Sequence, residues 1–147
     1  MESLENVLKK VVGLSIWDFR ISESTGSIIS FECGNKCLLE NNEDRQFEGN
    51  YSFMVYCSWK ICKNNKLIGS WKDEIEALNN IFTSMENAKI KQIVLTEVFD
   101  LKISLSDGCD LYVFCDLGEM ADFDCNWFFR ELENYYSVNN MLEVEVE

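Results

Sequence analysis

Apolar and polar positions alternate along most of the chain in short segments with the two-residue period of β-strands. This alternation in LSIWDFRIS and SIISFEC predicts a first hairpin that turns at Thr25-Gly26. The next apolar segment, YSFMVYCSWKI, runs from Tyr51 to Ile61 with Lys60 as its only formal charge, and we predict that it forms one central strand. Its core-facing side would comprise Tyr51, Phe53, Val55, Cys57, Trp59 and Ile61.

Two segments have apolar residues at helical spacing instead. SLENVLKKVV predicts a short amphipathic helix with Ser3 as its N-cap and Gly13 at its end. DEIEALNNIFTSMENA predicts a second helix, with acids in the first turn where the helix dipole favours them. Ser70 and Asp73 have the spacing of a capping box before that helix. The polar residues from Asn35 to Asn50 predict a long loop.

The rest of the chain again has strand-like patterns joined by turn signals. KNNK, residues 63–66, predicts a turn that leads into LIGSW as a partner strand. Later strands are predicted in KIKQIVLTEVF, LKISLS, DLYVFCDL and NWFFREL, and MLEVEVE would be an edge strand whose glutamates discourage further pairing. We therefore predict that residues 1–147 form a single α+β domain. It would be a mostly antiparallel, meander-like β-sheet of six to eight strands with two helices, the second packed across the sheet.

Composition excludes several classes of protein. No apolar stretch approaches the roughly 18 to 20 residues that span a bilayer, and the N-terminal segment lacks the pattern of a secretory signal, so we expect a cytoplasmic protein. The seven cysteines form an odd set scattered among strand-like segments, which favours reduced, mostly buried thiols. A chain of 147 residues suits one domain.

Recognisable catalytic chemistry is absent from the sequence. Without any histidine, a Ser-His or Cys-His nucleophile cannot be assembled, and neither a phosphate-binding glycine loop nor zinc-type cysteine spacing occurs. The acids of DLGEMADFD do not match a calcium-binding loop. We expect no enzymatic activity, catalytic residue, metal site or cofactor; an enzyme that uses carboxylates and a divalent ion is the alternative.

The acidic excess lies almost entirely in the last third of the chain. Residues 1–96 hold 13 acids and 11 bases, a net charge of −2, whereas residues 97–147 hold 13 acids and two bases, a net of −11. Such a field repels nucleic acid and anionic lipid and attracts basic proteins, although an acidic surface can also serve solubility alone. Candidate partner-binding residues, with Phe128 as an aromatic anchor, are Asp107, Asp110, Asp116, Glu119, Asp122, Asp124 and Phe128.

Two blocks resemble small bacterial immunity proteins encoded beside polymorphic toxins, including those of contact-dependent growth-inhibition systems. They are YSFMVYCSWKICKNNKLIGSWKDE, and EVFDLKISLSDGCDLYVFCDL followed by NWFFRE, together spanning about Tyr51 to Glu131. Lys60 stands where the pattern has arginine. The resemblance implies a stoichiometric inhibitor of a cognate toxin domain, and many such toxins are basic nucleases. The alternative is a structural or regulatory homo-oligomer, such as a homodimer formed by pairing exposed strands.

Overall fold

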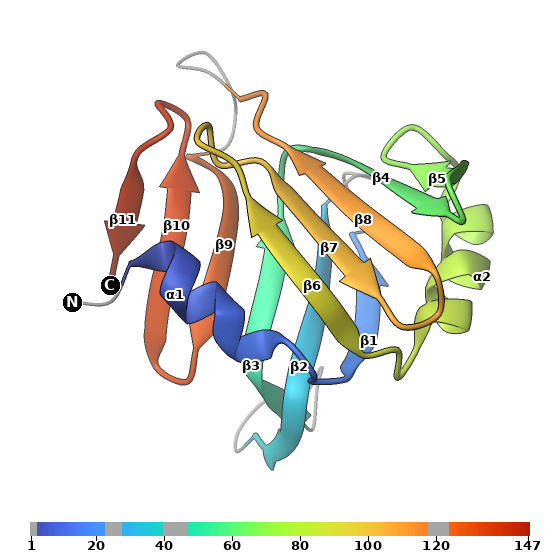
Figure 1. Cartoon of the computed structure of the whole chain (residues 1–147), viewed down its shortest axis with the longest axis horizontal. Helices are drawn as coiled ribbons and strands as arrows, with labels where there is room; N and C mark the ends of the chain where they lie inside the picture. Colours follow the sequence, from blue (N-terminus) through green and yellow to red (C-terminus); the bar gives the residue numbers. More distant parts are fainter. Residues whose placement is uncertain (1–2, 23–27, 40–46, 118–123) are drawn as a thin grey trace.

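Two antiparallel β-sheets pack face to face (Figure 1). The computed structural model describes residues 3–22, 28–39, 47–117 and 124–147, and every element below lies in these ranges. The six-stranded sheet has the order β1-β2-β3-β9-β10-β11, with bounds β1 Ile16–Ile21, β2 Ile29–Leu38, β3 Phe47–Val55, β9 Cys125–Glu131, β10 Asn134–Asn139 and β11 Val144–Val146. The five-stranded sheet has the order β5-β4-β8-β7-β6, with bounds β4 Ser58–Lys63, β5 Lys66–Ser70, β6 Ile90–Leu95, β7 Leu101–Leu105 and β8 Cys109–Phe114.

Two short helices complete the fold. Helix α1 (Leu4–Leu8) continues into a 3-10 turn, Lys9–Val11, and helix α2 (Ile75–Met85) packs against β1 and β5. The predicted class, a mostly antiparallel α+β domain with one helix packed on the sheet, is confirmed. The described residues form eleven strands in two sheets, more than the six to eight predicted for one meander. Neither helix among the described residues is long and apolar enough to cross a membrane.

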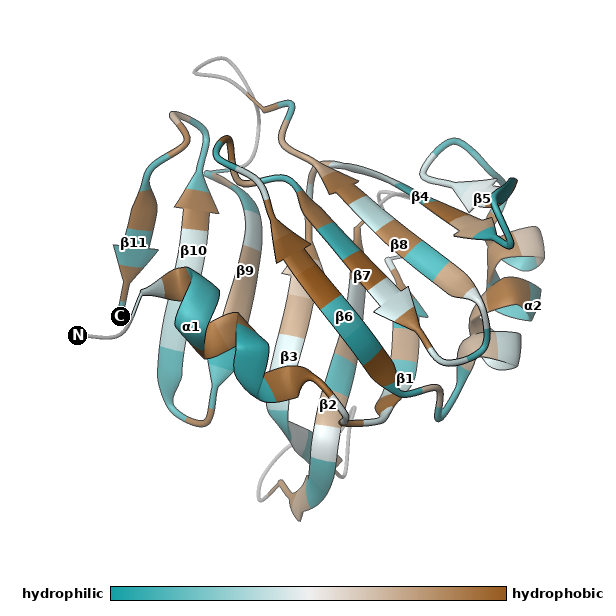
Figure 2. Ribbon diagram, viewed as in Figure 1, coloured by the Kyte–Doolittle hydropathy of each residue, from teal (hydrophilic) through white to brown (hydrophobic). Residues whose placement is uncertain are grey.

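One hydrophobic core fills the space between the sheets. Hydrophobic and hydrophilic residues are interleaved along the strands (Figure 2), and the apolar sides of both sheets face one another. The largest fully buried aromatic side chains come from both sheets and are Trp59, Trp127, Phe31, Phe53 and Phe129. Both helices add to the same core, α1 through Leu4, Val7 and Leu8, and α2 through Leu78, Phe82 and Met85.

The segment YSFMVYCSWKI is not a single strand, which corrects the sequence prediction. Strand β3 ends at Val55 and β4 begins at Ser58 in the other sheet. Between them the N–H groups of Tyr56 and Cys57 both donate to the carbonyl of Asn126, at 2.8 and 3.1 Å. The alternation of buried and half-buried residues continues through this corner, so periodicity alone could not reveal it. The predicted core side is otherwise correct, although Tyr51 is only half-buried.

The loop predicted from Asn35 to Asn50 is also wrong in part. Its ends belong to β2 and β3, and residues 40–46 lie outside the described residues. A β-bulge lets the two strands continue: Gly34 has a φ of +84°, and the N–H of Asn35 donates to Oδ1 of Asn50 at 2.9 Å. The far end of β2 is exposed, which explains its polar sequence. Strand β10, in the sequence NYYSVN, was not predicted at all.

Several local predictions are confirmed. Asn64 and Asn65 turn between β4 and β5 with φ values of 50° and 68°, as a two-residue hairpin turn requires. Ser3 caps α1 by accepting from the N–H of Asn6 at 3.2 Å. The N-cap of α2 is Glu74, however, so Asp73, which accepts from the N–H of Ser70 at 2.8 Å, shapes the approach to the helix and does not cap it. The turn at Thr25-Gly26 lies outside the described residues.

Candidate partner-binding surface

The acids predicted from the sequence do not form one patch. Asp107 lies in the turn before β8, Asp110 is the second residue of β8, and Asp116 lies beyond its far end. Asp107 accepts from the N–H of Cys109 at 3.0 Å, which stabilises the turn between β7 and β8. Asp116 accepts from the N–H of Ser58 at 3.2 Å and also from the Ser58 hydroxyl. Glu119 and Asp122 lie outside the described residues. The acids therefore occupy separate ends of one strand, and two of them have structural partners.

The buried side-chain amide of Asn126 holds the C-terminal end of β8, next to Asp116, beside β9 and β10. Asn126, fully buried, accepts through Oδ1 from the N–H groups of Asp116 and Leu117 at 3.0 and 3.1 Å. Its Nδ2 donates to the carbonyl of Asn139 at 3.1 Å. Asp124, two residues earlier, is exposed. Asp116 and Asp124 are thus held near the same end of the molecule.

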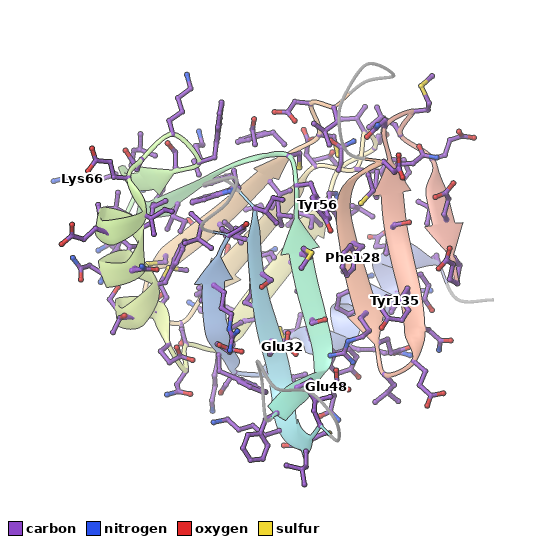
Figure 3. All side chains as sticks on the ribbon, turned by 180° about the vertical axis from the view of Figure 1, so that it is seen from behind. Glu32, Glu48, Tyr56, Lys66, Phe128 and Tyr135 are labelled. Carbon is purple, nitrogen blue, oxygen red and sulfur yellow. The ribbon has the colours of Figure 1, made fainter. Side chains whose placement is uncertain are left out.

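Phe128 lies on the side of β9 that faces away from the core. Its neighbours Trp127 and Phe129 are fully buried, so strand alternation turns Phe128 outward, where it is half-buried. Pairing across the sheet places Met54 opposite Phe128, and Tyr135 opposite Arg130. We call this side of the six-stranded sheet the outer face, and define it by Ser30, Glu32, Ser52, Met54, Phe128, Arg130, Tyr135, Ser137 and Glu145. Figure 3 shows no helix in front of it.

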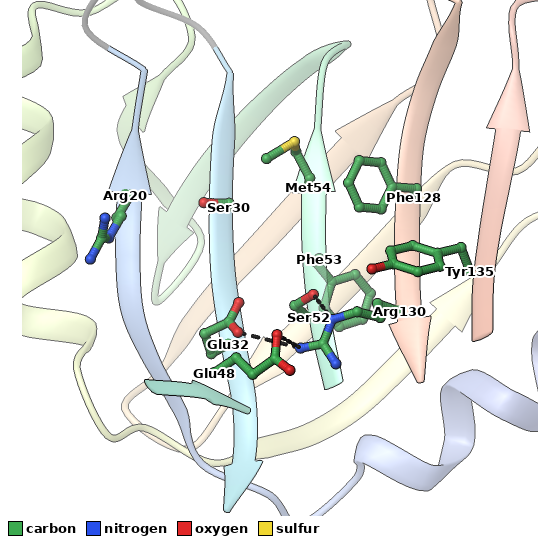
Figure 4. Close-up of a pocket in the computed structure, with 10 residues that line it drawn as sticks. All are labelled: Arg20, Ser30, Glu32, Glu48, Ser52, Phe53, Met54, Phe128, Arg130 and Tyr135. Carbon is green, nitrogen blue, oxygen red and sulfur yellow. Dashed lines mark hydrogen bonds and ion pairs between the residues drawn. The ribbon is translucent and has the colours of Figure 1, made fainter. Parts of the chain in front are cut away.

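The centre of the outer face is hollowed into a cavity of about 410 Å³ (Figure 4). Its apolar wall is formed by Met54, Phe128 and the 44% exposed Tyr135, and the Phe128 and Tyr135 ring centroids lie 6.3 Å apart. Its other lining residues are polar or charged, apart from Phe53: Arg20, Ser30, Glu32, Glu48, Ser52 and Arg130. Half-exposed aromatic and methionine side chains in a hollow are typical of the anchor positions of protein interfaces.

The floor of this cavity is a buried ion cluster centred on Arg130. The guanidinium donates to the carbonyls of Gly49 and Leu132 at 2.8 and 3.0 Å and to Oγ of Ser52 at 3.2 Å. It also pairs with Oε1 of the buried Glu32 at 3.4 Å and with Oε2 of Glu48 at 3.7 Å. Since a buried charge needs such partners, this arginine has a structural role here. The other arginine that lines the cavity, Arg20, is exposed and pairs with Oδ1 of Asp18 at 2.7 Å.

An acidic rim borders the outer face, and we define it by the exposed acids Asp124, Glu133, Glu143, Glu145 and Glu147. Residues 124–147 contain six acids and a single base, Arg130, which is the buried one. Glu143, Glu145 and Glu147 are exposed along and beside β11. The sixth of these acids, Glu131, pairs with Nζ of Lys10 at 2.8 Å. An apolar centre beside a negative rim suits a basic protein partner.

The described cysteine thiols whose pKa values are shifted are all shifted upward. Burial raises the pKa of the Cys33 thiol, and contact with the Cys115 thiol, together with burial, raises that of Cys57. Burial and the neighbouring Asp107 raise the pKa of Cys109 to about 11. Burial likewise raises the pKa of Cys125. A thiolate nucleophile requires the opposite shift. Within the described ranges, no group of three or more cysteines or acids could hold a metal ion.

Sequence reasoning found Phe128 but missed the residues around it. Glu32 and Arg130 lie 98 positions apart in the chain, so no local pattern connects them. A signal did exist: each is a charged residue at an outward position of a strand whose alternate positions are strongly apolar. Tyr135 was missed because β10 was not predicted.

The resemblance of residues 51–131 to immunity proteins stays a prediction from the sequence. Comparison of the chain with protein-family models, curated proteins and solved structures finds no significant match.

Proposed function

We propose that this chain is an immunity protein that neutralises a cognate toxin domain by binding it stoichiometrically through the outer face and its acidic rim. One observation carries the proposal: half-exposed Met54, Phe128 and Tyr135 adjoin a rim of acids, while the nearest arginine, Arg130, is buried and paired. Such a surface offers an apolar anchor together with a negative field. It fits a basic partner better than nucleic acid, a membrane or a small substrate.

Electrostatic attraction would set the association rate of this complex. A negative rim steers a basic domain toward the outer face and raises the association rate, most strongly at low ionic strength. A toxin that is a basic nuclease would present the surface that otherwise holds its substrate, and an acidic inhibitor could occupy it. We place this encounter in the cytoplasm, which accords with seven unpaired cysteines.

The direct test uses the gene upstream of this one. We expect its C-terminal domain to be basic, to co-purify with this protein in a one-to-one complex, and to lose its toxicity on co-expression. Replacing Phe128 and Tyr135 by alanine should weaken the complex by about tenfold or more for each residue, as for central aromatic anchors. The matched control is Phe114→Ala, a partly exposed aromatic on the five-stranded sheet, which should leave affinity unchanged. Equal losses from all three variants would contradict docking at the outer face.

Charge variants test the acidic rim separately. Asp124→Asn and Glu133→Gln should slow association and make it less sensitive to salt, because they remove rim charge. Asp110→Asn, near the start of β8 in the five-stranded sheet, is the control and should change the association rate little. If Asp110→Asn slows association as much as Asp124→Asn does, the acidic field acts as a whole and the rim has no special role.

A homo-oligomer that pairs through strand β11, whose outer side no described strand covers, is the second candidate. Sedimentation at two salt concentrations separates the two functions. A self-associating protein whose glutamates repel one another would assemble more readily at high salt, whereas an inhibitor awaiting its partner stays monomeric at both.

A further inference from the structure

Strand β11 is the open edge of the six-stranded sheet. It pairs with β10 on one side, and no described strand pairs with its other side (Figure 1). The opposite edge, β1, packs against helix α2, as does β5 of the other sheet. The other edge of the five-stranded sheet is β6. The segment after α1 contacts it, and Ser15 forms an antiparallel β-bridge with Lys89 there. Open edges of this kind accept strands from other chains.

The hydrogen-bond pattern of β11 shows which backbone groups face outward. The N–H of Tyr135 donates to the carbonyl of Glu147 at 2.9 Å, and the N–H of Glu147 donates back at 2.8 Å. Antiparallel pairs alternate between bonded and non-bonded, so Glu145 is also bonded to β10, whereas Val144 and Val146 are not. The N–H and carbonyl groups of Val144 and Val146 therefore point away from the sheet, available to a further strand.

Acidic and apolar side chains alternate along this edge. Val144 and Val146 stand opposite Val138 and Tyr136, which are buried, and so lie on the core side of the sheet. They nonetheless stay 37% and 42% exposed, because they line an apolar cleft of about 410 Å³ with Leu4, Leu95, Phe99 and Tyr136. Glu145 stands opposite Ser137 on the outer face, with Glu143 and Glu147 in the same alternation.

We propose that an extended segment that alternates basic and apolar residues binds β11 as an added strand. Its backbone would pair with Val144 and Val146, its lysine or arginine side chains would face the three glutamates, and its apolar side chains would lie beside the cleft. The inference deepens the proposed function, on which it rests, because it names the part of a basic partner that the edge would hold. Cross-strand pairs of opposite charge stabilise such a sheet.

The same geometry disfavours a second copy of this chain on the edge. Antiparallel pairing of two β11 strands would put the glutamates of both copies on one face, where directly opposed like charges destabilise the sheet. Alternating acids on an edge prevent self-association and leave it open to a strand of opposite charge.

The test measures amide exchange on the full-length protein with a short acetylated peptide that alternates lysine with valine. Bound peptide should slow hydrogen exchange at the amides of Val144 and Val146, which no described strand covers. A scrambled peptide of the same composition, with its lysines in one block, should bind about tenfold more weakly. Unchanged exchange at these two amides, or equal binding of the scrambled peptide, would overturn the proposal. So would exchange that slows with protein concentration when no peptide is present, since the occupant would then be a second copy.

A proline at position 146 isolates the backbone contribution. Val146→Pro removes an N–H that faces solvent, so pairing with β10 is kept and the fold should persist, as circular dichroism can check. It should weaken peptide binding about tenfold, whereas Val146→Thr, which keeps the N–H, should change it less than about twofold. Equal effects of the two variants would contradict strand addition.

The upstream toxin domain separates this inference from the proposed function. If that domain binds and Val146→Pro has no effect on its affinity, strand addition is wrong and docking at the outer face stands. If the peptide protects the edge but the domain does not bind, the edge proposal holds and the proposed function fails.

Discussion

The two sheets differ in the sign of the charge that their strands carry. Strands β4 to β8 carry five lysines and one acid, Asp110, whereas the described strands of the six-stranded sheet carry five acids and three bases. On the five-stranded sheet, the ammonium groups of Lys60 and Lys102 lie 5.2 and 5.6 Å from the ring centroid of Tyr112. On the six-stranded sheet, the guanidinium of Arg130 is buried against Glu32. A net charge of −13 therefore conceals two differently charged faces.

The difference shows that identical charge types have different energetic roles at different depths. A lysine above a tyrosine ring keeps its contact with water and gains a weak attraction. A buried arginine has lost its water, so its stability depends on the partners that replace it. Substitutions should therefore affect stability far more on one sheet than on the other.

The largest effect is expected at Arg130. Arg130→Ala should lower the free energy of unfolding by about 3–5 kcal/mol, because Glu32 would be left buried without its cation. The exposed pair between Arg20 and Asp18, at 2.7 Å, supplies the control, and Arg20→Ala should cost less than about 1 kcal/mol. Urea titration measures both, and similar losses would show that the cluster is not buried in solution. Adding Glu32→Gln to Arg130→Ala should recover part of the loss.

An intermediate effect is expected at the glycines, one in each sheet. A Cβ at Gly49 would lie 2.5 Å from the backbone carbonyl oxygen of Cys33, so Gly49→Ala should cost about 1–3 kcal/mol. A Cβ at Gly69 would meet only side-chain ends, Cδ1 of Ile81 at 2.9 Å and Cδ2 of Leu78 at 3.2 Å. These can shift, so Gly69→Ala should cost less than Gly49→Ala in the same titration. The reverse order would contradict the close strand approach at the bulge.

The smallest effect is expected at the lysines of the five-stranded sheet. Lys60→Met and Lys102→Met should each cost about 0.5–1 kcal/mol, measured by thermal unfolding, since each removes an exposed cation–π contact. Lys66→Met is the matched control, since Lys66 lies over no aromatic ring of the described residues, and it should be close to neutral. A loss at position 66 as large as at 60 would attribute the effect to charge alone.

Local patterns predicted the elements whose causes are local. The Asn64-Asn65 turn, helix α2 and the edge strand MLEVEVE each depend on residues within a few positions of one another. The corner at Tyr56 and Cys57 was missed because the carbonyl that receives both N–H groups belongs to Asn126, far along the chain. The end of β2 and all of β10 were missed because their exposed positions are polar, which resembles a loop in sequence.

Of the candidate surface, the sequence predicted Phe128 and, in the acidic rim, Asp124. Charge counting placed the acids in the last third of the chain, but it could not separate Asp107 and Asp110 from Asp116. These residues are close in sequence, although the extended strand β8 places them at opposite ends. The pairing of Glu32 with Arg130 arises from the register between β2, β3 and β9, a property of the folded sheet.

The corner between β3 and β4 also affects the order in which the two sheets can fold while the chain is being synthesised. The five-stranded sheet comes from one continuous segment, residues 58–114, whereas the six-stranded sheet needs both β1 to β3 and the later β9 to β11. Until β9 has been synthesised, β3 has no partner on one side, and closing that long loop is an entropically slow step. The surface that we assign to the partner would thus be the last to form, so binding competence would mark the end of folding.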